Sequence, residues 1–134
     1  MDLTERAKDY YRAFERHDRA FMEDNLRADF TFTSPFDDHI DRAAYFKRCW
    51  PEKPLHQSFD FVAVMQDGDK VFAAYDAIMR LPNATHPEAR FRNAELMTFQ
   101  DGKLKSVEVF FGDPPGDPPG GLTRREFAVQ SGAA

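Results

Sequence analysis

The chain has 134 residues, of which 42% are apolar, and its formal net charge is −5 at neutral pH. This is the length of one ordinary domain, large enough to fold without a disulfide bond or a metal ion. No basic run exceeds two residues and no apolar run approaches the about 20 residues of a membrane span, which excludes nucleic-acid and membrane partners. The acidic N-terminus has no apolar signal region, and we therefore expect a cytoplasmic protein.

The first part of the chain has the periodicity of helices. Residues 2–17 carry apolar side chains on one helical face, at Leu3, Ala7, Tyr10, Tyr11 and Phe14. Asp18 is placed to cap a second, short helix that ends near Asn25. Asp41 is placed to cap a third helix, which Pro51 ends.

Alternating apolar residues predict one short strand among these helices and four longer strands after them. The short strand covers residues 29–33 and ends before Pro35. The longer strands are residues 57–66, 70–81, 90–100 and 103–111. Asp67-Gly68 joins the first two of them as a hairpin, and Asp101-Gly102 joins the last two. Helices segregated from an antiparallel sheet predict the α+β class, with three N-terminal helices packed on the sheet.

The composition changes after residue 112, where Pro and Gly repeat. We therefore interpret residues 1–112 as one domain and residues 113–134 as a Pro/Gly-rich linker and C-terminal tail. Two interpretations of the tail remain open: a disordered segment, or an arm that packs on a partner subunit.

Short sequences at fixed places accompany this order of elements. They are His17-Asp18 after the first helix, Arg27-Ala28-Asp29 before the first strand, and the last hairpin from Phe99 to Gly112. Together, over residues 3–112, they resemble the nuclear transport factor 2-like superfamily, which includes ketosteroid isomerase and the SnoaL-like polyketide cyclases. The resemblance implies a curved antiparallel or mixed sheet that forms a cone with the helices, with an internal pocket for a small apolar molecule. It also implies a homodimer through the outer sheet face.

The resemblance to ketosteroid isomerase assigns roles to individual residues. Tyr10 and Glu95 occupy the places of the tyrosine and the protonated acid that stabilise the dienolate oxygen in that enzyme. The place of its carboxylate base is taken by Ser34, and a serine without a partner is no base at neutral pH. Asp38 and His39 follow in a predicted loop at the pocket mouth, and we expect one of them to act as the base.

Glu95 lies in an otherwise mostly apolar strand. On a face that lines the pocket its carboxyl group would be desolvated, which raises the pKa and suits acid–base chemistry. The alternative is an ion pair with an arginine of the neighbouring strands, namely Arg80, Arg90 or Arg92. Asn93 shares the Glu95 face by alternation, and it either lines the pocket or lies at a dimer interface.

The register of the last hairpin decides what faces Glu95. A two-residue turn at Asp101-Gly102 places Glu108 opposite Glu95, whereas a three-residue turn with a bulge places Val107 there. A glycine at the third loop position favours the bulged turn. We therefore predict that Glu108 lies on the outer face.

The remaining candidate pocket residues are mostly aromatic. We expect the ligand to contact Phe14, Phe32, Trp50, Phe61, Asn93, Met97 and Phe99. We expect no cofactor and no metal ion, because the histidines are scattered without a ligand motif. Cys49 lies near a helix C-terminus and is interpreted as a small buried hydrophobe rather than a nucleophile.

Three functions remain open from the sequence. The first is a cofactor-independent isomerase, cyclase or dehydratase that acts on an apolar carbonyl compound by acid–base chemistry. The second is a noncatalytic module that holds a small apolar ligand in the same pocket. The third is an interaction protein whose sheet pairs with another chain.

Overall fold

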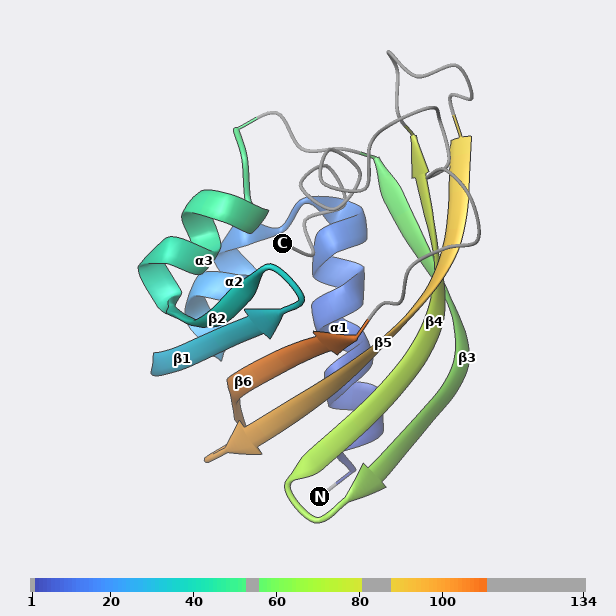
Figure 1. Ribbon diagram of the computed structural model, residues 1–134. Helices are drawn as coiled ribbons and strands as arrows, with labels where there is room; N and C mark the ends of the chain where they lie inside the picture. Colours follow the sequence, from blue (N-terminus) through green and yellow to red (C-terminus); the bar gives the residue numbers. More distant parts are fainter. Residues whose placement is uncertain (1, 53–55, 81–87, 111–134) are drawn as a thin grey trace.

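The structure, a computed structural model, describes residues 2–52, 56–80 and 88–110, which form three helices and six strands (Figure 1). The helices are α1 (Leu3–Arg16), α2 (Arg19–Asn25) and α3 (Arg42–Cys49). The strands are β1 (Leu26–Ser34), β2 (Asp37–Asp41), β3 (Gln57–Asp67), β4 (Lys70–Arg80), β5 (Glu88–Gln100) and β6 (Lys103–Phe110). The predicted tail, residues 113–134, lies outside the described residues.

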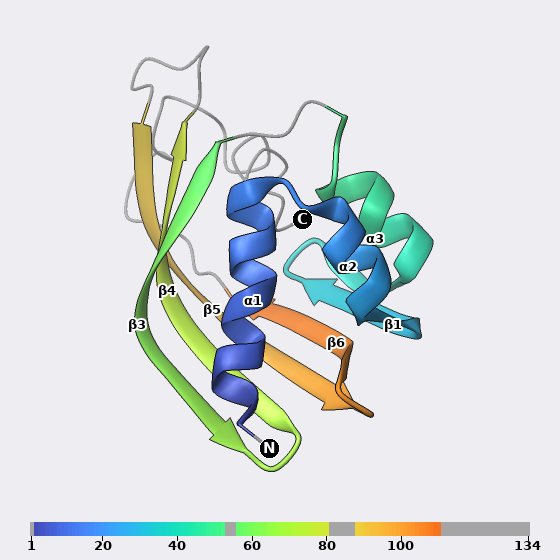
Figure 2. The same cartoon turned by 180° about the vertical axis from the view of Figure 1, so that it is seen from behind.

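The six strands form one mixed sheet in the order β2-β1-β6-β5-β4-β3. Only the β1–β6 pair is parallel, and the other neighbours are antiparallel. The sheet is strongly bent, and α1 lies along its concave side with α2 and α3 beside it (Figure 2). This is the predicted α+β arrangement of three helices on a curved sheet.

The three predicted helix starts are confirmed by their caps. The Asp2 carboxylate accepts a hydrogen bond from the Thr4 backbone amide, Asp18 accepts one from Phe21, and Asp41 accepts one from Ala44. Each cap satisfies an amide that has no partner inside the helix. These caps fix where the chain turns toward the sheet.

The predicted loop that contains Asp38 and His39 is wrong, because these residues belong to strand β2. β1 and β2 form a hairpin in which Ser34 pairs with Asp37 across a two-residue turn. The Ser34 hydroxyl accepts from the Phe36 amide and donates to the Asp37 carboxylate, each at 3.0 Å. β2 is an edge strand, and its exposed polar residues therefore lack the alternation that identifies a half-buried strand.

The turn of the last hairpin has two residues, with Gln100 paired to Lys103. Asp101 and Gly102 have φ values of 54° and 77°, as the central residues of a type I′ turn do. The predicted three-residue turn is therefore wrong.

A β-bulge beyond this turn sets the register at the site. The pairing shifts between Thr98 and Phe99, so Glu95 lies opposite Val109 and neither Glu108 nor Val107 faces it. The predicted outward position of Glu108 is confirmed, because this residue lies opposite Leu96 and is exposed. The extra residue of the bulge carries no signal in the sequence, which is why both predicted registers differ from the structure.

The hydrophobic core fills the space between α1 and the concave face of the sheet. It includes Ala7 from α1, Val71 and Ala73 from β4, and Met97 from β5, each at most 1% exposed. Within the described residues, no helix is both long enough and apolar enough to cross a membrane.

Candidate functional site

A cavity of about 50 Å³ lies inside the cone, between α1 and the sheet. A buried water needs roughly 10–15 Å³ of such volume, so the cavity holds a few waters or the end of a larger ligand. Its described wall is apolar and aromatic, apart from Gln57, Asn93, Glu95 and the hydroxyl groups of tyrosines. These few polar groups therefore determine what the cavity can recognise.

Glu95 of β5 is the only carboxylic acid in the described wall of the cavity. The Tyr75 hydroxyl, from β4, donates a hydrogen bond to Glu95 Oε1 at 2.6 Å. The Tyr11 hydroxyl, from α1, donates to Glu95 Oε2 at 3.0 Å. A helix and two strands thus hold one carboxyl group between two hydroxyl donors.

Burial raises the pKa of Glu95, and the hydrogen bonds from Tyr75 and Tyr11 only partly offset that rise. Burial, followed by the neighbouring Glu95 charge, also raises the pKa of both tyrosines well above the ordinary value. The two hydroxyl groups therefore remain protonated donors at neutral pH.

Asn93 extends this arrangement by one residue. It lies directly opposite Tyr75 across β4 and β5, is 4% exposed, and lowers the pKa of Tyr75 by less than burial raises it. The hydrogen of the Tyr75 hydroxyl is directed at Glu95, so this hydroxyl group has no hydrogen left to donate to Asn93. The amide oxygen, Asn93 Oδ1, is buried and has no hydrogen-bond partner in the described part of the chain.

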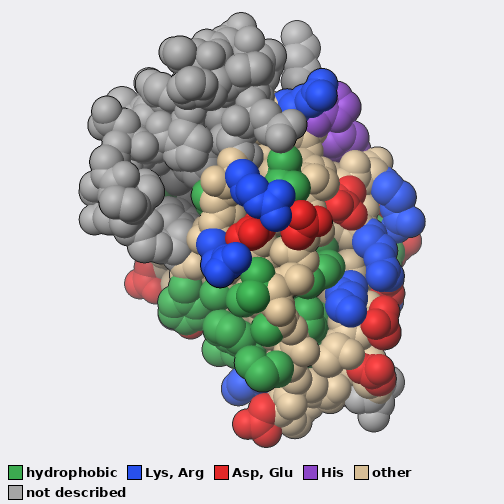
Figure 3. Space-filling model, turned by 90° about the vertical axis from the view of Figure 1, so that its right-hand side faces the viewer, with side chains coloured by type: hydrophobic (Ala, Val, Ile, Leu, Met, Phe, Trp, Pro, Cys, Tyr) green, Lys and Arg blue, Asp and Glu red, His purple; other side chains and the backbone are tan. Residues whose placement is uncertain are grey.

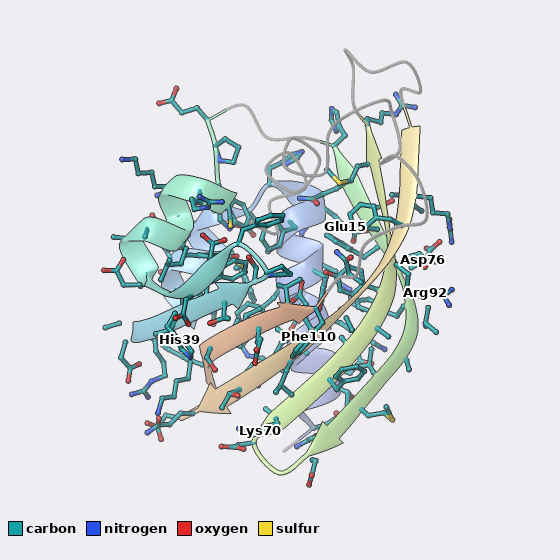
Figure 4. All side chains as sticks on the ribbon, in the orientation of Figure 1. Glu15, His39, Lys70, Asp76, Arg92 and Phe110 are labelled. Atoms are coloured by element: carbon teal, nitrogen blue, oxygen red, sulfur yellow. The ribbon has the colours of Figure 1, made fainter. Side chains whose placement is uncertain are left out.

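The alternative ion pair between Glu95 and an arginine is not formed among the described residues. Arg92 lies 2.9 Å from Asp76, and Arg90 lies 3.2 Å from Asp76 and 3.0 Å from Asp60. Asp76 and Arg92 lie together on the outer side of the sheet (Figure 4). The cationic side chains of β5 therefore neutralise carboxylates outside the cone and leave Glu95 with neutral partners.

The structure brings most of the predicted pocket residues to the cavity wall. Those that line it are Tyr10, Phe14, Phe32, Asn93, Glu95 and Met97. Trp50, Phe61 and Phe99 are not part of the described wall and support it from behind. Trp50 stacks on Phe14 at 4.5 Å between ring centroids, Phe61 contacts Tyr11 and Phe99 contacts Tyr10.

Tyr10, which was predicted to stabilise the ligand oxygen together with Glu95, does not hydrogen-bond Glu95 in the structure. The Tyr10 hydroxyl donates to the backbone oxygen of Asn25 at 2.8 Å, so its hydrogen points away from Glu95. Tyr11 and Tyr75, which sequence reasoning missed, take that role. The sequence does indicate the side on which Tyr75 lies, because strand alternation places it on the face opposite Asp76.

Asp38 and His39 do not reach the cavity. Their side chains are 93% and 73% exposed and pair with each other at 2.6 Å. His39 lies on β2, at the edge of the sheet (Figure 4). The structure therefore does not bring these two residues together with Glu95.

The two remaining candidates are the Cys49 thiol and a metal site. Cys49 is buried, and burial raises the pKa of its thiol to about 12, so it carries no thiolate at neutral pH. In the described ranges, no three residues among the histidines, cysteines and acids are grouped so that they could hold a metal ion.

The sequence and the fold were compared with known proteins. The family model described as SnoaL-like domain matches residues 7–107. No curated protein matches the sequence significantly.

Solved structures with low sequence identity share the fold. An epoxide hydrolase from M. tuberculosis, described as LEH-like, has a TM-score of 0.68 at 12% identity, covering 82% of each chain. A protein from Kribbella flavida described as a putative ketosteroid isomerase has a TM-score of 0.68 at 18% identity, covering 88% of this chain and 83% of its own. IdmH from Streptomyces antibioticus, described as a putative polyketide cyclase, has a TM-score of 0.65 at 14% identity, covering 82% and 91%.

Proposed function

The chain belongs to the SnoaL-like domain family, and on that premise we propose that it is a cofactor-independent enzyme in which Glu95 moves a proton on a small carbonyl compound. The observation that carries the proposal is the Glu95 carboxyl group, which lines a mostly apolar cavity and, within the described residues, accepts its hydrogen bonds from neutral donors. A structural carboxylate is more often paired with a cation, as Asp76 is in this chain.

The proposed reaction is proton abstraction next to a carbonyl group. The Glu95 carboxylate takes a proton from that carbon and leaves an enolate. The protonated Glu95 then no longer needs both hydrogen bonds from Tyr11 and Tyr75, and one hydroxyl is free to turn to the enolate oxygen. Return of the proton to another carbon completes an isomerisation. If the proton on Glu95 first exchanges with solvent, delivery of a solvent-derived proton to the same carbon gives isotope exchange alone.

Three solved structures with the same fold are relevant to this proposal. Proteins described as a putative ketosteroid isomerase, a putative polyketide cyclase and an LEH-like epoxide hydrolase have this fold. The position of the base differs from the prediction from sequence: we assign proton transfer to Glu95 itself rather than to Asp38 or His39, because those two side chains are exposed.

Hydrogen–deuterium exchange tests the proposal without knowledge of the natural substrate. Small ketones such as acetone and butanone are incubated with the protein in D₂O, and loss of the proton signal next to the carbonyl is followed by NMR. We expect the wild-type protein to accelerate exchange and Glu95→Gln to lose about 100-fold or more of that rate, the usual contribution of a general base.

Glu108→Gln is the matched control, because it makes the same chemical change at an exposed carboxylate of the neighbouring strand. This variant should keep the wild-type exchange rate. Equal rates for wild-type and Glu95→Gln protein would refute proton transfer by Glu95 and favour the alternative of a noncatalytic ligand-binding module.

A further inference from the structure

The hydrogen bonds of the site all run in one direction. The Tyr75 hydroxyl donates to one Glu95 oxygen, the Tyr11 hydroxyl donates to the other, and Asn93 lies directly opposite Tyr75 on the neighbouring strand. Each of these donors points toward the carboxyl group. Both tyrosine hydrogens are therefore already used, and the buried group without a partner in the described wall is an acceptor.

That acceptor is the side-chain oxygen of Asn93, Oδ1. It has no partner among the described residues, although Asn93 is only 4% exposed and lines the cavity. Buried amide oxygens in native proteins nearly always accept a hydrogen bond, so an orphan one facing a cavity points to a ligand that supplies the donor. Tyr75 cannot supply that donor, because its hydroxyl hydrogen is given to Glu95.

We propose that the ligand of this cavity carries a hydroxyl group that donates its hydrogen to Asn93 Oδ1, so that Asn93 selects hydroxylated carbonyl compounds over plain ketones. The inference rests on the proposed function for its carbonyl group and adds the substrate class. A plain ketone has only acceptors, so it would leave Asn93 Oδ1 unpaired in the filled cavity.

A neutral hydroxyl group fits this site better than an ammonium group does. One alcohol hydrogen matches one unpaired acceptor. An ammonium group brings three donors, and the two surplus ones would face a wall of aromatic and aliphatic side chains such as Phe14, Phe32 and Met97. Both Glu95 oxygens are already occupied by tyrosine hydroxyls, so the carboxyl group offers a cation less than an open carboxylate would.

Hydroxyacetone and butanone form a matched pair of probes, because they differ by a hydroxyl group in place of a methyl group. Their dissociation constants are measured by NMR titration of the labelled protein. We expect wild-type protein to bind hydroxyacetone about fivefold to tenfold more tightly, the net value of one neutral hydrogen bond. Asn93→Leu should lower this preference to about one while butanone still binds.

Gln100→Leu is the control variant, since it removes an exposed amide of the same strand that is not part of the described wall, and it should keep the wild-type preference. A preference near one in wild-type protein, as expected if water alone satisfies Asn93, would overturn the inference. So would an undiminished preference in Asn93→Leu. If that variant does not fold, the side-chain amide signals of Asn93 in wild-type protein decide instead: they should shift with hydroxyacetone and not with butanone.

The binding ratio requires no turnover, which separates this inference from the proposed function. A clear ratio without isotope exchange would leave hydroxyl recognition standing and refute catalysis by Glu95. Exchange without a ratio would support the enzyme and refute the role of Asn93.

Discussion

At the scale of single residues, the site depends on one carboxyl group in an unfavourable place. Burial of Glu95 opposes its charged form, and two tyrosine hydroxyls compensate only in part. A group whose protonation equilibrium is displaced by its surroundings, inside a cavity, is characteristic of a functional site rather than of a stabilising ion pair. The same residue must therefore cost stability, and that cost must depend on pH.

The sign of that dependence follows from linkage. The folded-state pKa of Glu95 is raised above its ordinary value of 4.5, so between these two values the folded state binds more protons than the unfolded state. The free energy of unfolding then falls as pH rises from about 4.5 through the folded-state pKa. We expect urea titrations to show this fall in wild-type protein and not in Glu95→Gln, which cannot ionise.

Glu108→Gln again serves as the control, because an exposed carboxylate should leave the pH profile close to that of wild-type protein. A difference between wild-type and Glu95→Gln stability that stays constant from pH 4 to pH 8 would contradict a raised pKa.

The sequence could predict some residues of the site because strand alternation is a local property. Glu95, Asn93 and Met97 lie at alternate positions of one strand, so they share a face wherever the strand packs. The sequence could not decide whether Tyr10 or Tyr11 hydrogen-bonds Glu95. Both lie on the buried side of α1, and only the packing of that helix against β4 decides which hydroxyl reaches Glu95. No pattern within the helix carries that information.

At the scale of elements, helix caps could be predicted, but the turn of the last hairpin and the strand register could not. Asp18 and Asp41 cap helices as expected, since a cap is a contact between neighbours in the sequence. The bulge in β6 depends instead on how β5 and β6 pack together over their whole length. Glu95 consequently faces Val109, and two carboxylates are kept apart without any signal in the turn itself.

The turn between β5 and β6 gives a prediction at this scale. Gly102 has φ +77°, and a Cβ atom added there would meet no atom within 4 Å. The cost of Gly102→Ala is therefore conformational rather than steric, and we expect it to reduce the free energy of unfolding by about 1 kcal/mol. Thermal and urea denaturation measure the change.

Gly102→Asn is the informative comparison, because asparagine adopts positive φ more readily than alanine does. It should recover much of the stability that alanine loses. Alanine and asparagine variants of equal stability would argue against a left-handed residue at this position.

At the scale of the whole molecule, the two faces of the sheet carry different features. The concave face carries the cavity, and the outer face carries exposed apolar side chains beside the ion pairs of Asp76 (Figure 3). Met65 and Phe72 are direct cross-strand neighbours, 59% and 37% exposed, and Phe110 is 47% exposed on the same face. Apolar groups gathered in this way favour contact with another protein surface.

We expect that surface to belong to a second copy of this chain, as the resemblance to the nuclear transport factor 2-like superfamily implies. Phe72→Glu places a charge in the apolar area and should convert a dimer to a monomer in sedimentation velocity experiments. Ala20→Glu adds the same charge at an exposed position of α2 and should leave the dimer intact.

The described cavity wall lies within one chain, so the Phe72→Glu monomer should retain isotope exchange by Glu95. A wild-type protein that sediments as a monomer at every concentration would refute the dimer, and loss of exchange in the variant would mean that the second copy supports the site.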